Sequence, residues 1–126
     1  MPLSNSEVTI QTLAMPADTN PNGDIFGGWL VSQMDLAAGI LAKKLSRGRT
    51  TTVAIHSMTF LRPVHVGNLV SCHVELITVG KTSMTIAVEV WTEELASGEK
   101  YCVTEGTFVF VAIDEQGKPR KIPKPV

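Results

Sequence analysis

The pattern of apolar and polar residues predicts one long helix near the start of the chain. Between Ile25 and Leu45 the apolar residues go nearly all the way round a helical projection, which is typical of a helix covered on several sides. Lys43 and Lys44 place positive charge where it suits the C-terminal end of a helix, and Gly48 follows. A helix of this length is roughly 30 Å long, enough to cross a small domain.

The other apolar residues are distributed as in strands, one before the helix and four after it. Residues 7–13 alternate between apolar and polar, and a loop rich in Pro, Asp, Asn and Gly follows over residues 15–23. Strands gathered after one helix favour an α+β domain with an antiparallel sheet. Because one curved sheet covers only one side of a buried helix, we expect a second copy of the chain to cover the other side. The four later strands are predicted at 52–61, 69–79, 82–94 and 101–113.

Length and composition describe one globular domain, 1–126. A chain of 126 residues buries one core but not two. With 44% hydrophobic and 18% charged residues it does not have the composition of a disordered protein. A net charge of −1 and the lack of a basic run argue against nucleic acid as a partner.

The same sequence predicts a cytoplasmic protein that does not bind membranes. Its first residues show no positive region followed by an apolar one, so no signal peptide is expected. The apolar stretch from Ile25 is interrupted by polar residues and is too short for a membrane span. Cys72 and Cys102 lie in predicted strands, and two cysteines make no disulfide framework, so reduced buried thiols are predicted.

Asp35 is the candidate catalytic residue, because it is the only charge between Ile25 and Ala42. A carboxylate on a buried apolar helix costs several kcal/mol unless it is paired or protonated, so a fold rarely keeps one for stability. A functional site is therefore favoured. The pattern leaves open an Asp at the helix surface, or one bonded to a neighbouring hydroxyl.

Gly27 and Gly28 fall just inside the first turn of the predicted helix. The first N–H groups of a helix have no partner within it and carry partial positive charge. Without a Cβ, a substrate oxygen can approach them closely, which suits the oxyanion of acyl transfer. From spacing alone, tight helix packing explains the glycines equally well.

The loop 18–24 superficially resembles a calcium-binding loop, with oxygen ligands at alternate positions and a Gly at the sixth. Its twelfth position is Trp29, where a bidentate Glu is needed, and no helix is predicted before it. We therefore reject calcium. The sequence also lacks Cys/His metal-ligand spacing, so no metal is expected.

Six segments spread along the chain carry a recognisable set of motifs: AMPADTNPNGDIFGGW (14–29), SQMD (32–35), MTFLRPV (58–64), EVW (89–91), YCVTE (101–105) and GKPR (117–120). Together they resemble the short-chain bacterial acyl-CoA thioesterases of the YciA type. The resemblance covers nearly the whole chain, and its longest block is highly specific. It implies the hotdog fold, a curved antiparallel sheet wrapped around one long helix. It also implies hydrolysis of acyl-CoA to a carboxylic acid and coenzyme A, without a cofactor.

In that family two protomers pair their sheets, active sites lie at the dimer interface, and dimers often assemble into hexamers. The resemblance places the family's catalytic carboxylate at Asp35 and a second polar position, from the other protomer, at Asp24. It places the oxyanion donor at the N–H of Gly27 or Gly28 and makes the adjoining Asn22 and Phe26 substrate-binding candidates. His56 departs from the family, whose close members carry an acidic residue there; as a strand histidine it is interpreted as structural.

Coenzyme A needs positive charge for its phosphates and a slot for pantetheine. The turn at Lys81, with the hydroxyls of Thr82 and Ser83, is the first candidate for the phosphate site. Arg62 is the second. The tail is a weaker source of charge, because chain termini are often poorly ordered. Its cations are Lys118, Arg120, Lys121 and Lys124.

Two mechanisms and two rival functions stay open at this point. Asp35 can act as general base on a water molecule or as the nucleophile itself. A hotdog hydratase or dehydratase would use a His with an acidic residue, which requires His56 to point inward. A non-catalytic acyl-CoA-binding protein would use the same cleft without chemistry.

Overall fold

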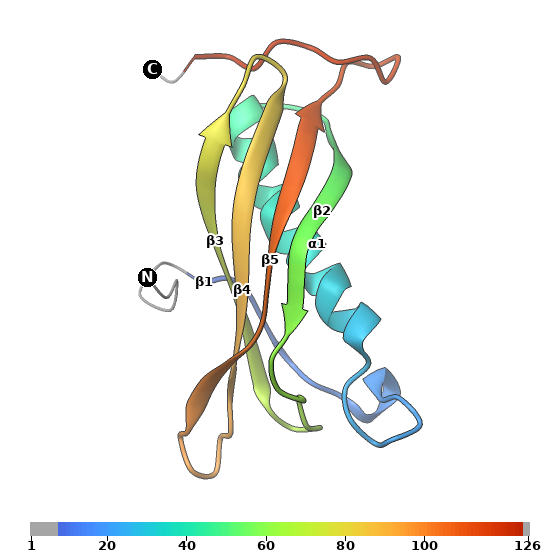
Figure 1. The fold of residues 1–126 in the computed structure, drawn as a ribbon, viewed down its shortest axis with the longest axis vertical. Coiled ribbons are helices and arrows are strands. Elements are labelled where there is room, and N and C mark those ends of the chain that lie inside the picture. Colours follow the sequence, from blue (N-terminus) through green and yellow to red (C-terminus); the bar gives the residue numbers. More distant parts are fainter. Residues whose placement is uncertain (1–7, 125–126) are drawn as a thin grey trace.

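The computed structural model describes residues 8–124, in which one antiparallel sheet of five strands packs against one long helix (Figure 1). The strands lie in the order β1-β3-β4-β5-β2, so β1 and β2 form the two edges. The predicted α+β architecture is confirmed. Glu7, with which the first strand was predicted to begin, lies outside the described residues. The elements are β1 (Val8–Leu13), the short 3-10 helix η2 (Pro16–Asp18), α1 (Gly27–Ser46), β2 (Thr50–Phe60), β3 (Leu69–Val79), β4 (Ser83–Glu93) and β5 (Lys100–Ala112).

The helix begins at Gly27, two residues later than the apolar pattern predicts. The two preceding backbone N–H groups are bound outside the helix: Ile25 N–H donates to Val64 O at 2.9 Å, and Phe26 N–H donates to Asp18 O at 2.7 Å. Phe26 has an extended backbone conformation, with φ −62° and ψ 129°. Contacts with the end of η2 and with the segment that follows β2 therefore set the start of α1.

Arg120 ties the end of the helix to the start of β2. Its Nη1 donates to Ser46 O at 2.9 Å and its Nη2 to Arg49 O at 3.2 Å, while its Nε donates to Ile113 O at 2.9 Å. The guanidinium thus donates to a carbonyl group of the last helical turn, and such a carbonyl accepts no hydrogen bond from within the helix. Gly48 keeps this contact possible, because a Cβ there would lie 2.6 Å from Arg120 Nη2. Arg120 is therefore engaged in the fold and not free for a phosphate.

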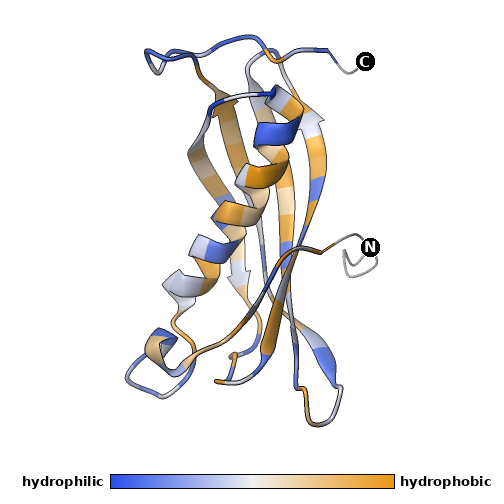
Figure 2. Cartoon of the chain, turned by 180° about the vertical axis from the view of Figure 1, so that it is seen from behind, coloured by the Kyte–Doolittle hydropathy of each residue, from blue (hydrophilic) through white to orange (hydrophobic). Residues whose placement is uncertain are grey.

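The core lies between α1 and the face of the sheet that it covers. Alternate residues of β4 are fully buried there, in keeping with the two-residue period of a strand. Figure 2, which views the molecule from the helix side, shows apolar residues on both α1 and the strands behind it. Within residues 8–124, α1 does not combine the length and apolarity that a bilayer-spanning helix needs. The buried helix residues are Leu30, Met34, Ala37, Ala38, Ala42 and Ser46.

The β2 edge keeps much of its apolar surface exposed. Within the described chain, β2 pairs with β5 alone, so its other side has no strand partner. Val53 is 54% exposed, Ile55 43% and Phe60 52%. Leu36, on α1, is 58% exposed. Apolar side chains on an open edge are unfavourable in an isolated protomer, and they fit an interface with another chain.

Candidate active site

The loop that precedes α1 is closed on itself by Asn20. Its N–H donates to Asp24 O at 2.7 Å, and its Oδ1 accepts from Asp24 N–H at 3.1 Å and from Asn22 N–H at 2.9 Å. Gly23 has φ +84°, a conformation that favours glycine, and completes this turn. Asn22 lies at the exposed tip, and Asp24 lies at the base, directly before the helix.

The first turn of α1 presents two unused backbone donors. Trp29 N–H and Leu30 N–H both donate to Phe26 O, at 3.0 and 3.4 Å. Gly27 N–H and Gly28 N–H donate to no acceptor among residues 8–124. The predicted placement of both glycines in the first helical turn is confirmed, and their N–H groups are available to an anionic oxygen.

A cleft of about 270 Å³ opens beside this turn. Phe60 forms one wall; its ring is so close that a Cβ on Gly27 would lie 3.4 Å from Phe60 Cε1. The Phe26 ring covers Gly28, where a Cβ would lie 2.5 Å from Phe26 Cε1. The cleft therefore combines apolar walls, a carboxylate and the first N–H group of the helix. Its lining is Asn20, Asp24, Ile25, Gly27, Leu30, Phe60, Leu61, Arg62, Pro63 and Val64.

Asp24 is paired with a histidine that the sequence analysis missed. His65 Nδ1 lies 3.3 Å from Asp24 Oδ1, and the adjoining Ile25 and Val64 are joined by the backbone hydrogen bond described above. His65 comes 41 residues after Asp24, between the strands predicted at 52–61 and 69–79. Residues in loops follow no periodic pattern of apolar and polar positions, so a single sequence gives no signal for a contact between two loops.

Asp35 lies on the side of α1 that faces β2, where it is half-buried. Thr52 Oγ1 donates to Asp35 Oδ1 at 2.6 Å, within the range of charge-assisted O–H···O⁻ bonds. The structure therefore contains the bond to a neighbouring hydroxyl that was named above, and this bond is compatible with either interpretation of Asp35. This bond fixes the carboxylate beside the exposed edge strand.

Asp35 and the cleft are separate in one protomer. Asp35 lies eight residues after Gly27 on the same helix, so their Cα atoms are about 12 Å apart along the axis. Reacting atoms must be within about 3–3.5 Å of one another. One protomer therefore holds two half-sites, the helix start with Asp24 and the helix middle with Asp35.

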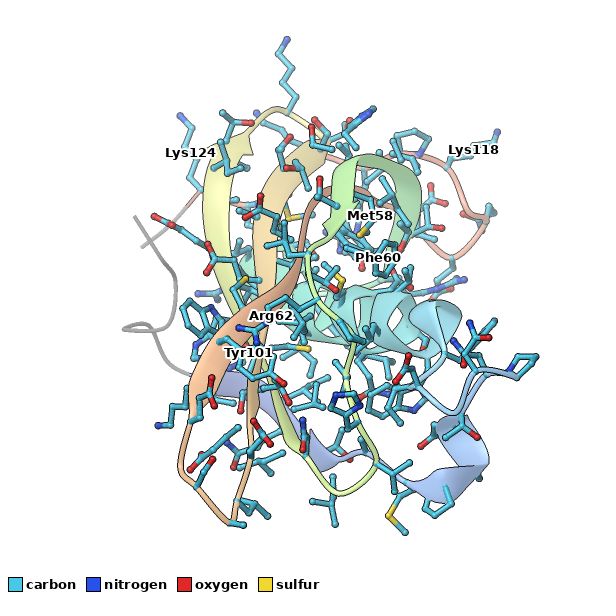
Figure 3. All side chains as sticks on the ribbon, turned by 60° about the horizontal axis from the view of Figure 1, so that its bottom comes forward. Met58, Phe60, Arg62, Tyr101, Lys118 and Lys124 are labelled. Carbon is cyan, nitrogen blue, oxygen red and sulfur yellow. The ribbon has the colours of Figure 1, made fainter. Side chains whose placement is uncertain are left out.

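The candidate coenzyme A residues also fall into two groups. Arg62 stacks on the Tyr101 ring, 3.8 Å from its centroid, at the end of the molecule where α1 begins (Figure 3). Lys81, Thr82 and Ser83 form the β3–β4 turn at the opposite end, where α1 ends (Figure 1). Ile122 N–H donates to Lys81 O at 2.7 Å and joins this turn to the tail. The two groups do not meet in one protomer.

Neither cysteine fits the role of a nucleophile. Burial raises the pKa of the Cys72 thiol to about 12. Burial, helped by the nearby Glu89 carboxylate, raises the pKa of Cys102 to about 11. Both thiols are free, as predicted, but only Cys72 is fully buried, whereas Cys102 is half-buried. Both are protonated at neutral pH, and the thiolate is the reactive form.

His56 lies on β2, outside the cleft, and among the described residues it takes no part in a metal site. His56 is exposed and pairs with Thr107, while its neighbour Ile55 pairs with the buried Phe108, so His56 points to the face of the sheet away from α1. Among residues 8–124, no cluster of three or more His, Cys, Asp or Glu side chains is placed to hold a metal ion.

Comparison with known proteins gives consistent matches. Residues 22–99 match the family described as "Thioesterase superfamily". The acyl-CoA thioester hydrolase YciA of Salmonella typhimurium is 53% identical over 120 residues, which cover 93% of this chain and 90% of that protein. A hexameric thioesterase from Yersinia pestis is 52% identical with a TM-score of 0.92, over 96% of this chain and 98% of that one. A hexameric broad specificity acyl-coenzyme A thioesterase, solved with one aspartate replaced by alanine, is 50% identical with a TM-score of 0.92, over 94% of this chain and 87% of that one.

Proposed function

This chain belongs to the thioesterase superfamily and has its hotdog fold, and on that premise we propose that it hydrolyses acyl-CoA thioesters at sites shared between two protomers. The observation that carries the proposal is the pair of unused N–H groups on Gly27 and Gly28 at the helix start, where Gly27 and Asp24 both line the cleft. Acyl transfer needs donors placed where negative charge develops on the carbonyl oxygen.

The oxyanion hole is built from the backbone of α1. Attack on the thioester carbonyl moves negative charge to its oxygen, and the N–H groups of Gly27 and Gly28 stabilise that charge. The partial positive charge of the helix start adds to the effect. The Phe60 ring packs against Gly27 and the Phe26 ring against Gly28, and the helix itself fixes the direction of both donors, so they need no reordering when charge develops on the oxygen.

Asp35 either activates the attacking water or is the attacking group itself. As a general base, its carboxylate accepts a proton while the water oxygen bonds to the carbonyl carbon; the carbon–sulfur bond then breaks, and the protonated Asp35 returns the proton to the sulfur, so that coenzyme A leaves as the thiol. As a nucleophile, the carboxylate bonds to the carbonyl carbon and the carbon–sulfur bond breaks, which releases a thiolate that takes a proton from solvent; water then hydrolyses the mixed anhydride to the free acid and restores the Asp35 carboxylate. In both routes Thr52 holds the carboxylate through the 2.6 Å hydrogen bond.

A second protomer completes each site. A two-fold dimer with antiparallel helices brings the start of one α1 beside the middle of the other, twice. The exposed β2 edge and its apolar residues provide the surface for such a pairing. Asp24 with the Gly27 and Gly28 donors would come from one protomer and Asp35 from the other, which removes the 12 Å gap along one helix.

The shared site also gives a place to coenzyme A. In such a dimer, the Lys81 turn belongs to the protomer that supplies Asp35. Asp35 lies eleven residues before the end of its helix, or about 16 Å along the axis. An extended pantetheine arm spans this order of distance, so the phosphates would reach Lys81, Thr82 and Ser83. Arg62 lies by the other half-site, where its contact with Tyr101 limits its reach.

The preferred assembly is a dimer that associates further into a trimer of dimers. Two solved relatives are hexameric thioesterases at 50% and 52% identity, which favours the same assembly here. No cofactor or metal enters the proposed reaction, and the acyl-CoA is the only small-molecule partner.

Hydration of an enoyl-CoA is the second candidate function, because a hotdog hydratase would pair a His with an acidic residue. His56 does not make that pair, since it points away from α1. His65 and Asp24 do, at the edge of the cleft. A non-catalytic acyl-CoA-binding protein is the third candidate.

Release of free thiol separates the three candidates. A chromogenic thiol reagent reports coenzyme A released from a panel of saturated and enoyl-CoA thioesters, and enoyl absorbance is followed in parallel. We expect thiol release with saturated substrates. Loss of enoyl absorbance without thiol would identify a hydratase, and binding without either signal would identify a non-catalytic protein.

A further inference from the structure

We infer that His65 is a positioning residue, which holds the Asp24 carboxylate at the mouth of the cleft by donating from Nδ1. The inference rests on the proposed function, because Asp24 belongs to the proposed site. Its basis is the 3.3 Å distance between His65 Nδ1 and Asp24 Oδ1. Both residues lie in loops, one directly before α1 and the other after β2.

The two loops are joined directly beside this pair. Ile25 follows Asp24 and Val64 precedes His65, and Ile25 N–H donates to Val64 O at 2.9 Å. Both of these residues are buried, with 4% and 1% of their surface exposed. The backbones next to Asp24 and His65 are therefore fixed relative to each other, so the pair does not depend on the chance meeting of two mobile loops.

Asp24 has little other restraint on its side chain. Its backbone N–H and C=O are both bound by Asn20, which fixes the main chain but not the carboxylate. Among residues 8–124, His65 makes the one polar side-chain contact to Oδ1, and the second carboxylate oxygen has no hydrogen-bond partner, so it can accept a bond from water or substrate. A carboxylate held in one orientation needs no reordering during the reaction.

The imidazole acts through Asp24 and not on the substrate. Asp24 lines the cleft, whereas His65 does not. Both the charged and the neutral imidazole can donate from Nδ1. The charged ring carries a proton on both nitrogens, and in the neutral ring the hydrogen-bond partner determines which nitrogen carries the proton. The His65 and Asp24 side chains are 58% and 36% exposed, so their pairing adds little to folding stability. Its effect should therefore be found in turnover.

Two substitutions at His65 test this role. His65→Ala removes the donor, and we expect kcat to fall roughly threefold to tenfold with KM within about twofold. His65→Asn keeps an amide N–H close to the place of Nδ1, so we expect most of kcat to return, at every pH between about 6 and 9. An alanine variant with wild-type kcat overturns the inference. So does an asparagine variant as slow as the alanine variant, because it would mean that the imidazole itself transfers protons.

A double substitution tests whether His65 acts through Asp24. At high enzyme concentration, the residual activity of Asp24→Asn should be nearly the same with and without His65→Ala. Equal losses in both backgrounds would overturn the inference.

A spectroscopic measurement gives an answer that is independent of turnover. At a pH where the ring is neutral, long-range ¹H–¹⁵N correlation distinguishes the two tautomers of His65. We expect the Nδ1–H tautomer in the wild type and a shift towards Nε2–H in Asp24→Ala. An Nε2–H ring in the wild type overturns the inference. If the wild type releases no thiol from acyl-CoA, the proposed function has failed, whereas thiol release without any effect at His65 removes only this inference.

Discussion

Thr52→Val is the substitution that probes the proposed base or nucleophile without touching it. The change removes the hydroxyl that donates to Asp35 Oδ1 at 2.6 Å and replaces it with a methyl group of similar size. Valine is also a good strand residue, so β2 keeps its propensity. The substitution therefore isolates one hydrogen bond at the middle of α1.

The size of the effect follows from that bond. A hydrogen bond to a charged group is worth roughly 1.5–3 kcal/mol, and the half-buried position of Asp35 favours the lower end. If the bond holds the carboxylate in its reactive orientation, about 1.4 kcal/mol corresponds to a tenfold loss of rate. We expect kcat/KM to fall about tenfold, mainly through kcat.

The assay is thiol release under saturating and limiting acyl-CoA, with thermal unfolding measured in parallel. Thr51→Val is the matched control: Thr51 is the exposed neighbour on the same strand, and it pairs with Val111. It should retain wild-type kinetics. A Thr52→Val enzyme with kcat/KM within twofold of wild type and an unchanged melting temperature would refute the claim that Thr52 orients a reacting carboxylate.

Three further predictions concern other parts of the molecule. Asp35→Asn should lower turnover by orders of magnitude, while the melting temperature stays the same or rises because a costly half-buried charge is relieved. Near-normal turnover would exclude Asp35 from the mechanism, and an unfolded variant would show that Asp35 has a structural role. Lys81→Ala should raise the KM for acyl-CoA and weaken inhibition by free coenzyme A with kcat little changed, whereas a substrate truncated to the pantetheine arm should be unaffected; equal losses with both substrates would exclude a phosphate contact. Treatment with iodoacetamide at pH 7.5 should leave activity intact, because the Cys72 and Cys102 thiols, with pKa values of about 12 and 11, become reactive thiolates only at much higher pH. Rapid inactivation by iodoacetamide that acyl-CoA prevents would contradict this prediction.

The fold could be predicted from the sequence wherever local pattern and turn residues agree. The strand predicted at 69–79 is β3 (Leu69–Val79) to the residue, since its alternation is bounded by turn residues on both sides. The start of α1 was predicted two residues early, because Ile25 and Phe26 suit a helix but donate to Val64 and Asp18 instead. Tertiary hydrogen bonds overrode a helical pattern there.

The site was predictable residue by residue but not as an arrangement. Asp35 and the two glycines have local signals, an isolated charge and a missing Cβ at a helix start. Lys81 and Arg62 were grouped only by charge, and the fold places them at opposite ends of the molecule. A sequence pattern within one segment does not show how far apart two segments lie in the fold, and it does not show that His65 contacts Asp24.

Mixed oligomers test the shared-site model most directly. Asp24→Asn and Asp35→Asn enzymes, each strongly impaired alone, are unfolded together, refolded, and shown by mass to contain mixed dimers. If each site takes Asp24 from one protomer and Asp35 from its partner, random pairing leaves one site in four with both carboxylates, so activity should return to about a quarter of wild type. If both residues serve a site from the same chain, every site carries a defect, and a mixture that remains inactive would contradict the model.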